Sequence, residues 1–362
     1  MKILYAIQGT GNGHISRARD IIPILQKEHE VDILISGCQV DMSLPFAVKY
    51  TYQGLSFVFG KNGGIDLFET YKKSNIKVLF MEINCLPVQL YDLVINDFEP
   101  VSAWACYQKN KKCISLSHQA AVLDKKAPQC KNADFIGKAI LKKYAPTTAQ
   151  YGFHFKAYNQ HIYTPVIRRQ IREQKAENKG HYTVYLPAYD DKRIIEILRE
   201  CKNTKWEVFS KHNKKVLTEK NITVRPINND AFVKSMASSE GVLCGAGFEA
   251  PAEALFLKKK LMVIPMKGQF EQQCNAAALK EMGVPVIKSL KKKHLSKIKD
   301  WIKLGKVIRV DYPDITEDIV KKILAEHAPS PANDRETIQP GKKVYSLKKF
   351  KQVTLKKIVA QL

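Results

Sequence analysis

The chain repeats one local pattern: a short run of apolar residues rich in β-formers, then a glycine-containing or polar turn, then residues with helical spacing. The first copy comprises a run at 2–7, a turn at 8–13 and a segment at 16–27 whose apolar residues recur on one helical face. Strands that alternate with helices at this spacing form parallel sheets covered by helices on both faces. The sequence therefore predicts an α/β fold.

The pattern occurs in two consecutive series. The first series covers 1–163, a polar and charged stretch at 164–180 interrupts it, and the second series covers 181–327. Open parallel sheets bind ligands at the carboxyl ends of their strands. We therefore expect two Rossmann-like domains, joined by a linker at 164–180, with a ligand cleft between them. The length of 362 residues suits two domains of ordinary size.

The expected elements follow from this pattern. The expected strands lie at 2–7, 31–36, 50–59, 93–96, 113–117, 182–186, 206–210, 222–226, 241–244 and 261–265. The expected helices lie at 16–27, 70–86, 191–201, 231–238, 249–257, 271–282 and 316–326.

Basic residues outnumber acidic ones, with 59 Lys and Arg against 35 Asp and Glu and a formal net charge of +24. This excess favours an anionic partner, such as a phosphorylated ligand, an acidic membrane surface or nucleic acid. The alternative is a solvated, lysine-rich surface. No zinc finger or RNA-recognition signature occurs, so sequence-specific nucleic-acid binding is not expected.

The last residues, 328–362, form a basic tail. Within 346–362 the apolar residues can share one helical face opposite lysines, which favours a helix on an acidic bilayer or, alternatively, one packed on the protein body. No run approaches the roughly 18 apolar residues that span a bilayer, and the start does not resemble a signal peptide. Eight scattered cysteines fit a reducing compartment. We expect a cytoplasmic protein, peripheral at the inner face of the membrane.

The first glycine turn reads Gly-Thr-Gly-Asn-Gly-His at 9–14. Its glycines, which include Gly11 and Gly13, allow a close approach of backbone to ligand. A nicotinamide-dependent oxidoreductase is disfavoured, because the G-x-G-x-x-G fingerprint needs its third glycine one position later. His14, at the start of the following helix, is a candidate general base. The alternative is that this histidine only caps the helix.

Two further polar residues follow buried strands of the first series. Asp97 comes just after the expected strand at 93–96, from where its carboxylate can reach His14 and fix the tautomer of the imidazole. The alternative is a strand-ending turn that Pro100 alone explains. His118 follows the strand at 113–117, and we expect it to line the acceptor side or to bond a backbone carbonyl.

The second series contains a glycine turn at 245–247 that ends a strand and opens a helix. Free backbone amides and the positive end of the helix dipole make such a turn an anion site, suited to a diphosphate. Further along that helix, the Glu253 carboxylate can accept two hydrogen bonds from a vicinal diol such as ribose. Each candidate has the alternative of being a surface residue at a helix start. The candidate donor-binding residues are Gly11, Gly13, Arg225, Ile227, Gly245, Ala246, Gly247, Phe248, Glu253, Gln269, Glu271 and Gln272.

The segment 247–276 resembles the donor motif G-x(5)-E-A…P…[DE]-Q-x-x-N-A of the GT-B glycosyltransferases, within them the MurG-like group, glycosyltransferase family 28. The resemblance covers the chain to about residue 326. It implies that residues 245–248 cradle a diphosphate, that Glu253 binds the nucleotide ribose, and that Glu271 and Gln272 bind the donor sugar. It also implies that His14 is the base and that Asp97 is its carboxylate partner.

One departure from the family concerns the phosphate loop, where many relatives carry a His, Ser, Thr or Arg side chain. Here Gly245, Ala246 and Ala250 supply none. Phosphate binding would then rest on backbone amides and the helix dipole, with Lys267 or Arg225 helping. No D-x-D sequence occurs, as in metal-independent enzymes.

The expected function is therefore an inverting, metal-independent transfer of a hexose from a UDP-sugar to an acceptor hydroxyl. The acceptor is expected to be a lipid-linked or cell-envelope glycan, and no cofactor is expected besides the nucleotide-sugar substrate. Two alternatives stay open. One is a nucleotide-sugar 2-epimerase of the same fold, and the other is a non-enzymatic, basic membrane- or nucleic-acid-binding protein.

Overall fold

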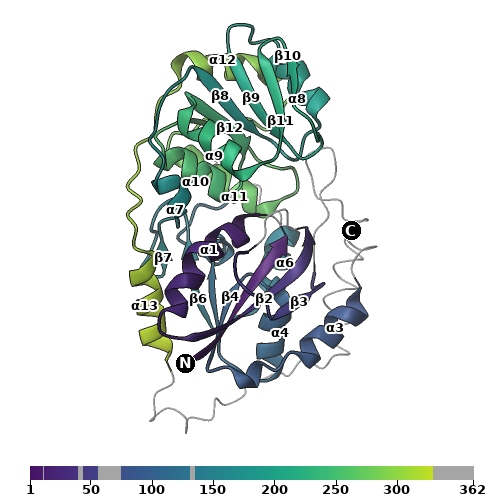
Figure 1. Ribbon diagram of the computed structural model, residues 1–362, viewed down its shortest axis with the longest axis vertical. Helices are drawn as coiled ribbons and strands as arrows, with labels where there is room; N and C mark the ends of the chain where they lie inside the picture. The colour runs from purple at the N-terminus through teal and green to yellow at the C-terminus, as the bar shows by residue number, and fades with distance from the viewer. Residues whose placement is uncertain (11, 40–43, 56–74, 131–134, 329–362) are drawn as a thin grey trace.

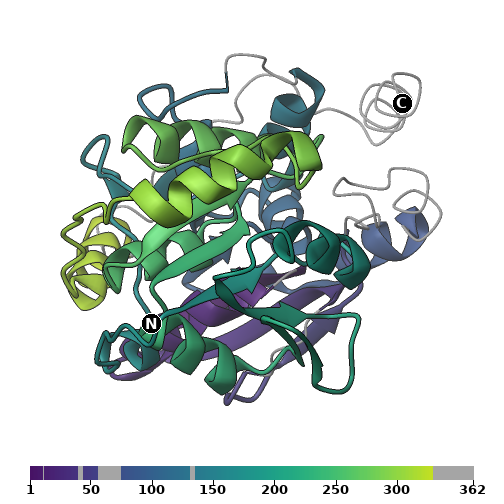
Figure 2. The same ribbon diagram turned by 90° about the horizontal axis from the view of Figure 1, so that it is seen from above.

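The structure is a computed structural model that describes residues 1–10, 12–39, 44–55, 75–130 and 135–328. It contains two parallel-dominated sheets, each flanked by helices and each formed by one half of the chain (Figure 1). Seen from above, the second domain lies over the first (Figure 2). The predicted α/β fold with two Rossmann-like domains is confirmed.

In the described residues the first sheet has seven strands in the order β3-β2-β1-β4-β5-β6-β7, all parallel. Its strands are β1 Lys2–Thr10, β2 Glu30–Gln39, β3 Tyr50–Tyr52, β4 Leu93–Asp97, β5 Cys113–Ser117, β6 Ala149–Phe153 and β7 Ile162–Tyr163. The helices of this half are α1 Asn12–Gln26, α3 Ile76–Cys85, α4 Pro100–Gln108, α5 His118–Leu123 and α6 Phe135–Tyr144, with the short 3-10 helix η1 Val88–Leu90.

The second sheet has six strands in the described residues, in the order β10-β11-β9-β8-β12-β13. Only the edge pair β10–β11 is antiparallel. Its strands are β8 His181–Tyr185, β9 Lys205–Ser210, β10 Leu217–Glu219, β11 Ile222–Pro226, β12 Gly241–Gly245 and β13 Lys260–Ile264. The helices of this half are α7 Arg169–Arg172, α8 Asp191–Leu198, α9 Asn229–Ser238, α10 Glu249–Phe256, α11 Phe270–Glu281, α12 Leu295–Leu304 and α13 Thr316–His327, with the 3-10 helix η2 Lys292–His294.

Both sheets have a topological switch point, where the strand order reverses. In the first sheet it lies between β1 and β4, and in the second between β8 and β12. Loops that leave neighbouring strands at a switch point run to opposite faces of the sheet and leave a space for ligands there. Residues 9–10 and 12–14 of the first glycine turn lie at the first point, together with Asp97, and the turn at 245–248 lies at the second.

The core explains why the two halves pack together. The apolar face of α1, which includes Ile15, Ala18 and Ile22, packs on the first sheet as its helical spacing predicts. The same cluster of buried residues continues into the second half through Val242 and Leu255. The two domains therefore share one continuous apolar core instead of meeting only at polar surfaces.

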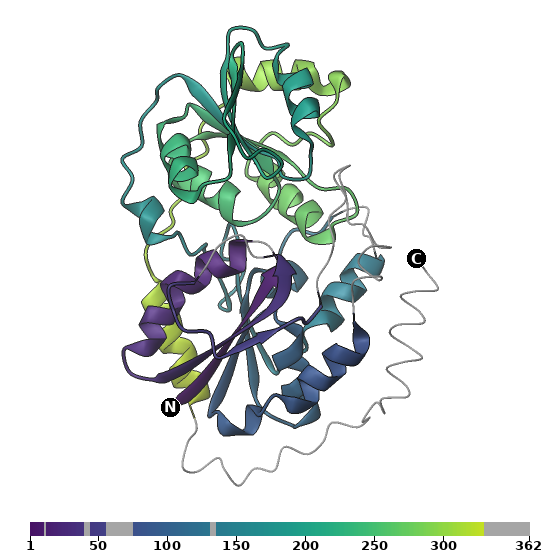
Figure 3. The same cartoon turned by 45° about the vertical axis from the view of Figure 1, so that its right-hand side comes forward.

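Helix α13 does not belong with the second sheet, although the sequence analysis placed 181–327 in one domain. It returns to the first domain and lies beside α1 (Figure 3). Its buried residues Ile319, Val320 and Ile323 join the shared core, and Glu317 pairs with Lys27 of the first domain. An amphipathic helix packs wherever an apolar surface remains uncovered, and its periodicity does not say which domain offers that surface.

Some expected elements differ in their bounds. The helix expected at 70–86 is α3, which begins after Asn75, because the Asn75 side chain accepts a hydrogen bond from the Val78 amide as an N-cap. Residues 70–74 and 56–59, at the end of the expected strand at 50–59, lie outside the described residues. The basic tail at 328–362 also lies outside them, apart from residue 328.

Candidate active site

His14 and Asp97 lie together at the switch point of the first sheet. The His14 Nδ1 atom is 2.8 Å from the Asp97 Oδ1 atom. β1 and β4 are neighbours with Ile7 opposite Asp97, so the end of β4 lies against the start of α1. Asp97 is fully buried, whereas the His14 side chain is 11% exposed. Because Nδ1 is held by the carboxylate, Nε2 is the ring nitrogen left for a substrate.

A buried arginine, which the sequence analysis missed, completes this pair. Arg17 lies one helical turn after His14 in α1 and directs its Nε and Nη2 atoms to the Asp97 carboxylate, at 2.8–3.1 Å. Burial opposes ionisation of Asp97, but the charge of Arg17 and the contact with His14 outweigh it, so the pKa of Asp97 lies below its usual range. The three-residue spacing from His14 to Arg17 in a helix was the available signal.

Arg17 also reaches the second domain. Its Nη1 atom donates to the Glu249 Oε1 atom at 2.5 Å. Glu249 is the first residue of α10, directly after the turn at 245–248. Burial raises the pKa of Glu249 above its ordinary value, the charge of Arg17 opposes this rise, and the nearby carboxylates of Glu253 and Asp97 add to it.

Gln119 links the first domain to the donor-side residue Glu271. The Gln119 Nε2 atom, on α5, donates to the Glu271 Oε2 atom at 3.0 Å and lies 3.5 Å from His14 Nε2. Burial raises the pKa of Glu271 above its ordinary value. The Gln119 side-chain oxygen is buried and has no hydrogen-bond partner in the described part of the chain. A substrate hydroxyl near His14 Nε2 would find an acceptor there.

His118 is buried between the domains and not on an open surface. Its Nδ1 atom is 2.8 Å from the Phe153 carbonyl oxygen, and its Nε2 atom is 2.8 Å from the side-chain oxygen of Asn275 in α11. The ring stacks on Phe248, with ring centres 3.9 Å apart. Burial lowers the pKa of His118 to about 3, so the imidazole is neutral at physiological pH. The expected bond to a backbone carbonyl is present.

Glu253 is buried and faces the linker. Arg168 donates hydrogen bonds to both carboxylate oxygens of Glu253, with a distance of 2.8 Å from Nη2 to Oε2. It also donates to the side-chain oxygen of Asn229. A bidentate Arg–carboxylate pair of this kind is strong and geometrically defined. The carboxylate that the family resemblance assigns to ribose is thus already paired within the protein, and its ribose role stays a prediction.

The remaining donor candidates are distributed around the turn at 245–248. Gln272 accepts a hydrogen bond from the Met266 amide at 3.0 Å, and its oxygen lies beside Gly245. The Ala246 amide donates to Ile264, so it is not available to a ligand, and Asn275 donates to the Ala246 carbonyl. The side-chain oxygen of Gln269, just before α11, has no hydrogen-bond partner among the described residues.

Four further candidates have fewer contacts with the turn at 245–248. Arg225, at the end of β11, lies 3.7 Å from Glu207, and the Ile227 amide donates to the Ser210 carbonyl, which leaves only the carbonyl of Ile227 for a base. Gly13 lies against the Glu249 side chain. Gly11 lies outside the described residues.

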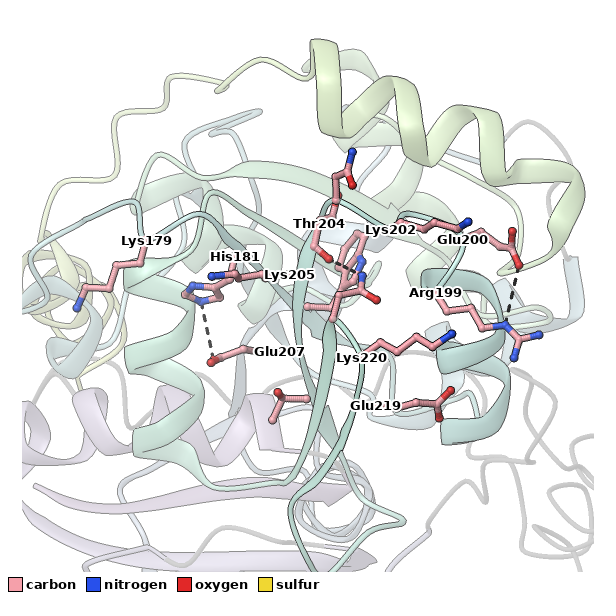
Figure 4. Close-up of a pocket in the computed structure, with 14 residues that line it drawn as sticks. Lys179, His181, Arg199, Glu200, Lys202, Thr204, Lys205, Glu207, Glu219 and Lys220 are labelled. Atoms are coloured by element: carbon pink, nitrogen blue, oxygen red, sulfur yellow. Dashed lines mark hydrogen bonds and ion pairs between the residues drawn. The ribbon is translucent and has the colours of Figure 1, made fainter.

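A surface hollow of about 1100 Å³ lies elsewhere, at the amino ends of the strands of the second sheet (Figure 4). Lys179, His181 and Arg199 lie along its rim, and ion pairs join His181 to Glu207 and Arg199 to Glu200. In α/β sheets the ligand lies at the carboxyl ends of the strands. The candidate active site is therefore the pair of switch points and not this hollow.

Within the described ranges, no group of three or more His, Cys, Asp or Glu side chains is arranged to hold a metal ion. In the same part of the chain, every helix is too short or too polar to cross a bilayer.

Solved structures similar to this chain include glycosyltransferases and an epimerase-like protein. MurG of Acinetobacter baumannii is 13% identical, with a TM-score of 0.54, over 90% of this chain and 99% of that one. UGT2 of Phytolacca americana, solved with UDP-2-fluoro-glucose and pterostilbene, is 11% identical, with a TM-score of 0.56, over 90% and 94%. A candidate UDP-N-acetylglucosamine 2-epimerase of Listeria monocytogenes is 10% identical, with a TM-score of 0.56, over 90% and 95%. No curated protein sequence matches the chain.

Two Rossmann-like domains arranged in this way form the GT-B architecture, which MurG and the epimerase-like protein share with this chain. The sequence model described as "Glycosyl transferase family 1" matches residues 1–304. The chain therefore belongs to this family and is a glycosyltransferase.

Proposed function

We propose that the protein transfers a hexose from a UDP-sugar to an acceptor hydroxyl with inversion at the anomeric carbon. The observation that supports this most is the His14–Asp97 pair, in which the His14 Nε2 atom lies 3.5 Å from Gln119, and Gln119 in turn donates to the donor-side residue Glu271. A histidine held by a carboxylate is a general base suited to a hydroxyl nucleophile. A base on the acceptor side, opposite the donor, is what single-step displacement requires.

In the proposed mechanism His14 Nε2 takes the proton of the acceptor hydroxyl while its oxygen attacks the anomeric carbon. The bond from that carbon to the diphosphate oxygen breaks, and the nucleoside diphosphate leaves with the electron pair. Asp97 stabilises the imidazolium that forms. The amino end of α10 stabilises the negative charge on the leaving diphosphate, a role that oriented dipoles can perform without a metal ion.

The test is a thermal-shift screen with UDP, GDP and their sugars, followed by product analysis by NMR. A ligand that binds the native state raises the melting temperature by mass action. We expect UDP and a UDP-hexose to raise it, and added EDTA to leave both the shift and the turnover unchanged. A glycosylated acceptor with an inverted anomeric centre supports the proposal, whereas conversion of the UDP-sugar without any acceptor would identify a 2-epimerase.

We also propose that the acceptor is a lipid-linked or cell-envelope glycan and that the enzyme works at the cytoplasmic face of the membrane. The support is the excess of basic residues over the whole chain, because anionic lipids attract clustered lysines and arginines. The full chain should float with vesicles that contain anionic lipid and stay in solution with purely zwitterionic ones. Equal flotation with the two kinds of vesicle would contradict the proposed membrane location and leave the proposed transfer reaction unaffected.

A further inference from the structure

The turn proposed for the donor diphosphate lacks a basic side chain of its own. Residues 244–250 read Cys-Gly-Ala-Gly-Phe-Glu-Ala, and the only charge among them is the negative one of Glu249. A carboxylate beside a diphosphate would repel it by like charge. The contact that Glu249 makes therefore decides how an anion could be held there.

Arg17 supplies a cation to this turn from the other domain. Two of its nitrogen atoms, Nε and Nη2, are fixed on Asp97, which leaves Nη1 directed to Glu249. The Arg17 side chain is 1% exposed, whereas that of Glu249 is 18% exposed. The cation is thus held firmly in the first domain, and its anionic partner is the member of the pair that can turn away into solvent.

A second observation also points to an anion at this position. A Cβ atom at Gly13 would lie 3.0 Å from the Glu249 side chain. The amino end of α1 therefore lies against the Glu249 side chain. Glu249 is itself the first residue of α10. Two positive helix ends and a guanidinium therefore converge on one carboxylate.

We propose that the Glu249 carboxylate stands in for a phosphate group of the donor. In the complex with the nucleotide sugar, that phosphate group binds the Arg17 Nη1 atom in its place. The diphosphate displaces the carboxylate, and Arg17 binds the donor from the acceptor domain. Guanidinium groups bind phosphate oxygens as they bind carboxylates, so one partner can replace the other on Nη1 while Asp97 keeps the rest of the guanidinium in place. The inference rests on the proposed function and adds to it a donor-binding residue that lies outside the donor domain.

The test is isothermal titration calorimetry with UDP and with uridine, which lacks the phosphates, on four versions of the full chain. These are the wild type, E249Q, R17K and the control R169Q, whose arginine is 84% exposed and pairs with Glu173. We expect E249Q to bind UDP about tenfold more tightly, because a neutral amide competes less for Arg17, and a tenfold change is about 1.4 kcal/mol. We expect R17K to bind UDP about tenfold less tightly. Uridine affinity should stay unchanged in all four proteins.

The outcomes separate the inference from the proposed function. A wild type that binds neither UDP nor GDP contradicts the proposed function, and the inference with it. A wild type that binds UDP, together with an E249Q variant that binds it equally or more weakly, overturns the inference alone. Circular dichroism checks the fold of R17K, which loses part of a buried ion pair. If R17K does not fold, the UDP affinity of E249Q alone tests the inference, since this substitution alters only a partly exposed side chain.

Discussion

Two buried arginines organise the charged residues of the active site. Arg17 holds Asp97 and reaches Glu249, and Arg168 holds Glu253. A buried carboxylate without a partner is costly, so each arginine offsets the burial of the acid that it contacts. The acids, in turn, orient His14 and fix the linker to α10.

At the residue scale, the proposed base gives the first prediction. H14A should lower turnover by on the order of 10²-fold or more, because the general base is lost. The measurement is UDP release from the donor in the presence of acceptor-containing membranes. H161A is the control, since His161 is exposed and lies before β7, the edge strand of the sheet, with three strands between β7 and β1. Turnover at the wild-type level in H14A would remove His14 from the mechanism.

The second prediction concerns Glu253 and Arg168. E253A and R168M should each lower the free energy of unfolding by roughly 3 kcal/mol, because each leaves a buried charge unpaired. The double variant should lose less free energy of unfolding than the sum of the two single losses. Urea denaturation measures this. If Glu253 also binds ribose, calorimetry will show weaker UDP binding for E253A than for R168M. Equal affinities would mean that Glu253 forms the ion pair with Arg168 but does not bind ribose.

The third prediction follows from the burial of His118. Its pKa is about 3 in the folded protein and near 6.5 when exposed, so the unfolded chain takes up the proton first as the pH falls. The free energy of unfolding should therefore fall between pH 7 and pH 5, by about 2 kcal/mol from this residue. Urea denaturation at both pH values should show a smaller fall for H118Q. An equal fall would contradict the assignment.

At the element scale, α13 ties the end of the described chain to the first domain. Its apolar face packs into the shared core, and its polar face carries exposed pairs such as Lys321 with Glu317. Tyr151 of β6 also contacts Glu326 and His327. The helix therefore stabilises the first domain although it follows the second along the chain.

Two substitutions in α13 test this. I323A should lower the free energy of unfolding by about 2–4 kcal/mol, since a buried side chain leaves a cavity. K321A, on the exposed side of the same helix, should change it by about 0.5 kcal/mol or less. Urea denaturation measures both. Equal small effects would mean that α13 contributes little to the packing.

At the scale of the whole molecule, the shared core makes the two domains depend on each other. Buried residues of both sheets belong to one apolar cluster, and Gln119, His118 and Arg17 add polar contacts across the junction. Domains with a large, apolar interface move less independently than those with small polar ones.

Differential scanning calorimetry tests this dependence. We expect one cooperative transition for the full chain, because the unfolding of either domain would expose the apolar core of the other. I323A should move that whole transition to lower temperature. Two transitions, of which only one responds to I323A, would show that the domains unfold separately.

The local sequence pattern predicts much of the fold, because strands, turns and helices depend on near neighbours. The apolar spacing of α1, the glycine turn at 245–247 and the strand before Asp97 all follow from residues a few positions apart. The candidate base and its carboxylate partner could be predicted for the same reason, since each lies just after a recognisable strand.

The sequence by itself determined the α/β class, the two series of strands and helices, and the turns at which a ligand site was expected. Tertiary structure alone decided which charges pair. Arg17 meets Asp97 and Glu249 across 80 and 232 positions of the chain, and Arg168 meets Glu253 across 85. No local pattern encodes these contacts, because they depend on where two switch points face each other after the domains have packed.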